Sequence, residues 1–109
     1  MTYQVKIVDE AKAELEKELK YSSQKWGKKH AKQYGMLFRD SIKALKNEAG
    51  IYPIQSQILS DIRIKKFKGN RIIYKIQDKD NTVIILAILS QRQNYNISVL
   101  KKRGKESKK

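Results

Sequence analysis

Four stretches of the chain show the hydrophobic pattern of β-strands. Apolar and polar residues alternate with a period of two over 2–8, 61–67 and 71–77, which is typical of strands with one buried face. The fourth stretch, TVIILAILS from Thr82 to Ser90, is apolar on both faces. Such a run predicts a strand at the centre of the sheet.

Between the first two strands, apolar residues recur every three to four positions, which predicts two helices. Asp9 is the expected N-cap of the first, and Gly27 is the expected break between them. One face of the first helix carries Ala11, Leu15, Leu19 and Trp26. The stripe of the second helix, over 28–48, is Ala31, Tyr34, Phe38, Ile42 and Leu45. We expect Trp26 and Phe38 in the core.

These elements predict an α+β domain. An N-terminal strand is followed by an antiparallel two-helix hairpin, which packs on an antiparallel β-meander. Residues 1–100 form the single predicted domain. The last segment, 101–109 or KKRGKESKK, has six cations, one acid and no apolar residue, so we expect a flexible, solvated tail.

The hairpin DIRIKKFKGNRIIYKI, over 61–76, allows two registers. A two-residue loop at Gly69-Asn70 places charged and apolar residues together on both faces. A three-residue loop, 68–70, pairs Phe67 with Arg71 and collects the isoleucines on one face. We expect this second register, because it buries the apolar set. It leaves an open face that carries Arg63, Lys65, Phe67, Arg71, Ile73 and Lys75.

The predicted open face is rich in cations, as is the whole chain. The chain has 109 residues, with 25 Lys and Arg against 11 Asp and Glu, for a net charge of +14. A surface of this sign attracts polyanions, and cations beside an exposed aromatic suit phosphates and stacked bases. The alternative is the ordinary solvated side of a sheet. In this register Arg63 and Lys75 would lie opposite each other across the two strands, and like charges in such a pair are destabilising. Stability alone therefore does not explain these cations.

Several other chemistries are excluded or disfavoured. Cysteine is absent, so disulfides and thiolate zinc sites are excluded. His30 is the only histidine and lies among lysines, which predicts a surface residue rather than a catalytic or metal-binding one. No phosphate-cradling glycine loop is present, and we expect no cofactor and no metal. The chain shows no membrane span or signal peptide, so we expect a cytoplasmic protein.

The whole pattern resembles the RelE/ParE superfamily of bacterial type II toxins. The resemblance is carried by VKIVDEAKAELEKEL, AKQYGMLFRDSIKAL, RIKKFKGNRIIYKI and VIILAILSQRQNY, over roughly residues 3–95. RelE-like members cleave messenger RNA in the ribosomal A site, ParE-like members inhibit DNA gyrase, and a cognate antitoxin neutralises both. The resemblance therefore implies an antitoxin partner and one of these two targets.

The RelE-like pattern also implies site residues. Arg63 and Lys65 match its paired strand cations, Arg71 in RIIY its central arginine, and Arg92 in SQRQNY its later arginine, whereas Tyr95 lies a few residues earlier than the family tyrosine. These five are the predicted catalytic residues. The predicted nucleic-acid contacts are Arg63, Lys65, Lys66, Phe67, Lys68, Arg71, Lys75 and Arg92.

The implied reaction is attack of an RNA 2′-OH on the adjacent phosphate, whose developing charge the cations would stabilise. The sequence thus favours a ribosome-dependent endoribonuclease, an mRNA interferase. A ParE-like gyrase inhibitor without enzymatic activity is the alternative. A plain nucleic-acid-binding domain is a third reading, which explains the charge but not the order of the elements.

Overall fold

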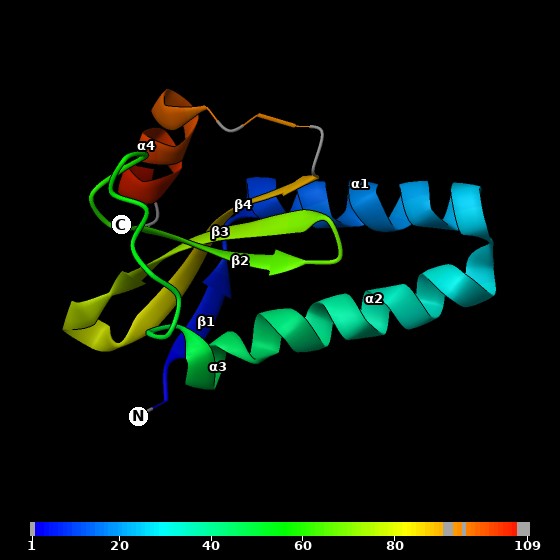
Figure 1. Ribbon diagram of the computed structural model, residues 1–109, viewed down its shortest axis with the longest axis horizontal. Helices are drawn as coiled ribbons and strands as arrows, with labels where there is room; N and C mark the ends of the chain where they lie inside the picture. Colours follow the sequence, from blue (N-terminus) through cyan, green and yellow to red (C-terminus); the bar gives the residue numbers. More distant parts are fainter. Residues whose placement is uncertain (1, 91–92, 95, 107–109) are drawn as a thin grey trace.

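The computed structural model describes residues 2–90, 93–94 and 96–106 (Figure 1). Its elements are β1 (Gln4–Ile7), α1 (Asp9–Trp26), α2 (Lys28–Lys43), α3 (Leu45–Glu48), β2 (Ile62–Phe67), β3 (Asn70–Gln77), the 3₁₀ turn η1 (Asp78–Asp80), β4 (Thr82–Ser90) and α4 (Ile97–Glu106). The predicted strands and the helical hairpin are confirmed. The N-cap prediction is wrong by one residue, because Val8 is the N-cap and Asp9 already belongs to the helix.

The four strands form one sheet in the order β1-β4-β3-β2. β1 runs parallel to β4, while β2, β3 and β4 form the expected antiparallel meander. β4 lies inside the sheet and all its residues except Ser90 are buried, as its two apolar faces predicted. The predicted α+β architecture is therefore correct.

Both faces of the sheet are covered. On one face, Ile72, Tyr74 and Ile85 pack with residues of the three N-terminal helices such as Phe38. On the other face, Ile62, Ile73 and Leu86 form a second core with Ile58 from the loop before β2 and Leu100 from α4. We call these the helical-hairpin face and the α4 face.

The predicted register of the β2–β3 hairpin is wrong. Phe67 pairs with Asn70, Lys65 with Ile72 and Arg63 with Tyr74. The turn therefore has two residues, Lys68 and Gly69, with φ angles of 43° and 83°. Two-residue turns with positive φ at both positions match the right-handed twist of a hairpin. Because the sheet is covered on both sides, its isoleucines did not need to share one face.

The predicted flexible tail also needs correction. Residues 101–106 belong to α4, which is held on the sheet by Leu100, 2% exposed, and by Arg103. The Arg103 guanidinium donates to Glu14 Oε1 at 3.0 Å and to the Leu86 carbonyl at 2.9 Å. Leu100, the apolar anchor, thus lies immediately before the charged segment 101–109. Within that segment, Arg103 is held by Glu14 of α1 and by the Leu86 carbonyl of β4. Residues 107–109 lie outside the described part of the chain.

The helical hairpin is longer than the part of it that covers the sheet. Phe38 is fully buried, as predicted, but the prediction of a core position for Trp26 is wrong, since 61% of this residue is exposed. Trp26 is the last residue of α1, and the α1–α2 connection projects beyond the strand ends (Figure 1). No sheet surface is available there to bury the indole.

Gly27 joins the two helices with φ 93° and ψ 162°, a conformation that only glycine adopts readily. We expect Gly27→Ala to lower the free energy of unfolding by about 1–3 kcal/mol through backbone strain. Urea unfolding followed by far-UV circular dichroism measures this loss. Gly50→Ala is the control: Gly50 is exposed and has no positive φ, and its added Cβ would meet only Tyr3 Oη at an ordinary 3.5 Å. Equal effects of the two substitutions would contradict the strain at Gly27.

Candidate functional site

The structure does not bring the predicted cations together on one surface. Arg63 and Lys65 pair with Tyr74 and Ile72 and so lie on the helical-hairpin face. Arg71 and Lys75 lie on the α4 face, with Lys66 opposite Arg71. The predicted single basic face is therefore wrong, because the hairpin register differs by one residue and each slip of one residue reverses the face of a strand.

Lys65 is a buried lysine, 8% exposed, inside a polar network. Its Nζ lies 2.7 Å from Glu48 Oε1 and 2.7 Å from the Ser41 carbonyl oxygen. The hydrogen bond from Lys65 is the main cause that lowers the pKa of the Glu48 carboxyl, which also accepts from the Tyr52 hydroxyl at 3.3 Å. Lys65 thus joins β2 to α2 and α3, and its ammonium is turned away from solvent.

Arg63 and Tyr74 hold the segment that follows α3. The Arg63 guanidinium donates to the carbonyls of Tyr52 and Gly50, the second at 3.3 Å. The Tyr74 hydroxyl donates to the Ala49 carbonyl at 2.6 Å, and burial raises the pKa of Tyr74 well above its usual range. Arg63, like Lys65, therefore lies on the helical-hairpin face and donates its hydrogen bonds to groups of the protein itself.

On the α4 face, the Arg71 guanidinium donates to the carbonyl of Ser90, at 3.3 Å, and to that of Gln93. Lys75 is 5% exposed and its Nζ donates to the Gly104 carbonyl at 3.0 Å. Lys66 is exposed beside Arg71. These three cations line β2 and β3 where α4 and the segment after β4 pass.

The remaining predicted contacts lie elsewhere. Lys68 is exposed in the β2–β3 turn. Phe67 packs against Phe38, with ring centroids 4.7 Å apart, so the prediction that it stands open among the cations is wrong. Arg92 and Tyr95 lie outside the described residues.

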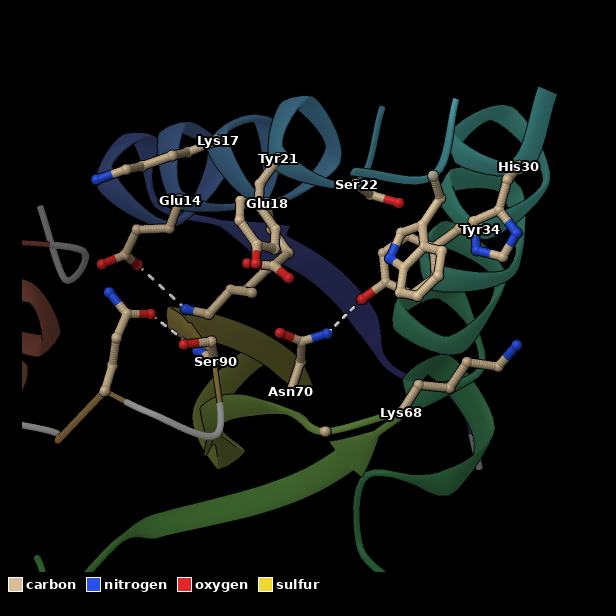
Figure 2. Close-up of a pocket in the computed structure, with 14 residues that line it drawn as sticks. Glu14, Lys17, Glu18, Tyr21, Ser22, His30, Tyr34, Lys68, Asn70 and Ser90 are labelled. Carbon is tan, nitrogen blue, oxygen red and sulfur yellow. Dashed lines mark hydrogen bonds between the residues drawn. The ribbon is translucent and has the colours of Figure 1, made fainter. Parts of the chain in front are cut away.

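A cleft of about 610 Å³, which sequence reasoning missed, lies between the helical hairpin and the β2–β3 turn with the end of β4. Its lining includes Tyr21, Trp26, His30, Tyr34, Lys68 and Asn70. Figure 2 shows the Tyr34 hydroxyl pointing from α2 to the Asn70 amide, which donates to it. Burial, and next the charge of Glu18, raise the pKa of this Tyr34 hydroxyl. The only sequence signal for the cleft was the group of aromatics near Gly27, which helical periodicity assigned to the core.

The cleft combines aromatic rings with groups of both charges. The indole of Trp26 and the imidazole of His30 lie 5.7 Å apart, and His30 is exposed, as predicted. Glu14 also lines the cleft, and its carboxylate accepts hydrogen bonds from the Arg103 guanidinium at 3.0 Å and from the Ile88 amide at 3.1 Å. Among the described residues, no three His, Cys, Asp or Glu side chains gather to hold a metal ion. The cleft thus offers a ligand aromatic surface together with cationic, anionic and amide groups.

Comparison with known proteins then identifies the family. The family model described as "ParE toxin of type II toxin-antitoxin system, parDE" matches residues 5–95. The chain belongs to this ParE toxin family. The resemblance to the RelE/ParE superfamily is thereby confirmed, and the protein is a type II toxin of that superfamily. No curated protein matches the chain significantly.

Solved structures of both ParE and RelE systems share the fold of this chain. The chromosomal ParDE system of P. aeruginosa gives a TM-score of 0.70 at 14% identity, over 82% of this chain and 96% of that one. The RelBE2 toxin–antitoxin complex of Mycobacterium tuberculosis gives 0.61 at 18% identity, over 83% and 99%. A mutant of E. coli RelE in the free state gives 0.52 at 16% identity, over 97% and 98%. These likenesses concern the fold.

No helix in the described part of this ParE-family chain is long and apolar enough to cross a membrane.

Proposed function

We propose that this ParE-family toxin acts by binding DNA gyrase and does not cleave RNA itself. The placement of Lys65 and Arg71 on opposite faces of the sheet argues against RNA cleavage, and the match to the ParE toxin family supports gyrase as the target. Charge stabilisation during RNA cleavage requires cationic groups that converge on one phosphate. Two cations separated by a covered sheet do not meet this requirement.

The internal partners of the cations support the same conclusion. The Lys65 ammonium is held by Glu48 and the Ser41 carbonyl, and Arg63 is held by the carbonyls of Gly50 and Tyr52. To reach a phosphate, Lys65 would have to leave a partly buried ion pair, which costs free energy unless another anion replaces Glu48. In this proposal the two residues stabilise the toxin fold.

The endoribonuclease predicted from the sequence is the alternative. The observation in its favour is that Arg71 reaches the carbonyls of Ser90 and Gln93, on either side of the segment that contains the predicted Arg92. Under this alternative Arg71 is the residue on which cleavage depends most. Arg71→Ala is therefore the variant that separates the two mechanisms.

We also propose a cognate antitoxin as the partner of this chain. The neighbouring structures from P. aeruginosa and M. tuberculosis are toxin–antitoxin systems. With a net charge of +14, this chain would be matched by an acidic or amphipathic antitoxin segment.

Two assays on one preparation test the mechanism. We expect the purified protein to inhibit supercoiling of relaxed plasmid by gyrase, and to leave a defined messenger RNA intact in a cell-free translation reaction read by primer extension. New 5′ ends at codon-spaced positions would overturn the proposal if they vanish when translation is blocked and are absent with Arg71→Ala. Unaffected gyrase together with intact RNA would overturn both mechanisms.

A further inference from the structure

The end of the helical hairpin is strongly basic. The segment 20–32, which we call the hairpin tip, contains Lys20, Lys25, Lys28, Lys29 and Lys32. All five lysines are exposed, and the chain has no Asp or Glu between Glu18 and Asp40. Neither ion pair found among the described residues includes one of them. The tip therefore presents uncompensated positive charge to solvent.

The same tip exposes aromatic surface. Trp26 is 61% exposed and Tyr21 46% exposed. The Lys25 ammonium lies 5.2 Å from the centroid of the Trp26 ring. A large indole left in water forgoes the free energy of its burial, so folding alone does not explain its position. Trp26 also stands at the mouth of the cleft, whose far side holds Lys68 and the Asn70 amide.

The tip is well placed to meet a large partner. The α1–α2 connection extends beyond the strand ends, away from α4 (Figure 1). A polymer can therefore contact the lysines without meeting the rest of the domain. Glu14 and Glu18, the acidic residues of the cleft, precede Trp26 on α1 by about two helical turns or more, so phosphates bound beside Trp26 lie roughly 12 Å or more along the helix axis from them.

We propose that the hairpin tip binds single-stranded nucleic acid. The lysines pair with phosphates, and the Trp26 indole stacks on an unpaired base at the mouth of the cleft. Stacking on aromatic residues within a basic groove is the common mode of single-strand binding. An acidic protein segment would also pair with the lysines, but the exposed indole beside them favours bases, whose flat faces stack on it. The proposal goes beyond the gyrase mechanism and does not depend on it.

Lysine variants test the phosphate contacts. Lys28→Gln/Lys29→Gln removes two charges from the tip, and Lys6→Gln/Lys79→Gln removes two exposed charges from β1 and η1, at the opposite ends of the strands. Binding of a labelled oligothymidine is measured by anisotropy at several salt concentrations. We expect the tip variant to lower the slope of log affinity against log salt by about 1.4, from two contacts of about 0.7 each, and the control to leave it nearly unchanged. Equal effects of both variants would overturn the proposal, because they would indicate attraction to net charge alone.

Trp26 variants test the stacking. Trp26 is the only tryptophan, so its fluorescence reports directly on this site. We expect oligothymidine to quench it, Trp26→Ala to weaken binding about tenfold or more, and Trp26→Phe to restore most of the loss. The exposure of Trp26 makes its replacement compatible with folding. Unchanged fluorescence on saturation, or equal affinity of Trp26→Ala and the wild type, would overturn the proposal, as would duplex DNA bound more tightly than the single strand.

Discussion

Phe38→Ala is expected to lower the free energy of unfolding by about 3–5 kcal/mol, the range typical of a large buried aromatic. Phe38 is fully buried in the core between the helical hairpin and the sheet. The centroid of its ring lies 4.7 Å from the ring centroid of Phe67 and 5.8 Å from that of Tyr34, which it meets edge-on. Truncation removes these contacts and leaves a cavity that neighbours on α2 and β2 fill only in part.

This loss is large for a domain of this size, since small proteins are commonly stable by about 5–15 kcal/mol. Urea unfolding followed by far-UV circular dichroism measures it. Met36→Ala is the matched control, because Met36 lies on the same helix and is 58% exposed. A Phe38→Ala protein as stable as Met36→Ala would contradict the packing of α2 on the sheet.

Lys65→Met is expected to lower the free energy of unfolding at neutral pH by about 2 kcal/mol. Breaking a fully buried pair costs roughly 3–5 kcal/mol, and the cost is smaller here because water can reach the remaining carboxylate. The side chain of Glu48 is 34% exposed, whereas that of Lys65 is 10% exposed. Lys66→Met is the control, because Lys66 is the exposed neighbour on the opposite face and should change stability little.

The same variant has a predicted pH dependence. In the folded state the pKa of the Glu48 carboxyl is lowered, chiefly by the hydrogen bond from Lys65, below its ordinary value of 4.5. The stabilisation is therefore complete above pH 4.5 and is lost as the pH falls through the lowered pKa. We expect the stability difference between the wild type and Lys65→Met to narrow as the pH falls from 7 towards 3. A difference that stays constant over this range would contradict the ion pair with Glu48.

Several errors in the sequence prediction have one physical origin, which is that a strand pattern does not show what covers each face. The period-two alternation of 61–76 is consistent with one open face and predicts that the cations share a surface. In the structure α4 and the loop before β2 cover that face, so Ile62 and Ile73 are buried on one side and Ile72 and Tyr74 on the other. The two-residue turn then decides the register.

The error in the β2–β3 register changed the predicted site more than it changed the predicted fold. The types of residue at Arg63, Lys65 and Arg71 were compatible with RNA cleavage, but their partners were not visible in the sequence. For Arg63 and Lys65 these partners are Glu48, the Ser41 carbonyl and the carbonyls of Gly50 and Tyr52, which lie 11 to 24 residues earlier in the chain. The cleft beside Trp26 was hidden for a related reason, since it lies between a helical hairpin and a β-turn that only packing brings together.

Local patterns by themselves determined the order of the strands and of the helical hairpin, the break at Gly27, the central position of β4 and the burial of Phe38. Each follows from hydrophobic periodicity or backbone preference within a few residues. Only the tertiary structure decided the hairpin register, the docking of α4, the internal partners of Lys65 and the exposure of Trp26. These features depend on which surfaces meet across the fold, and burial against a distant element overrides what the local pattern favours.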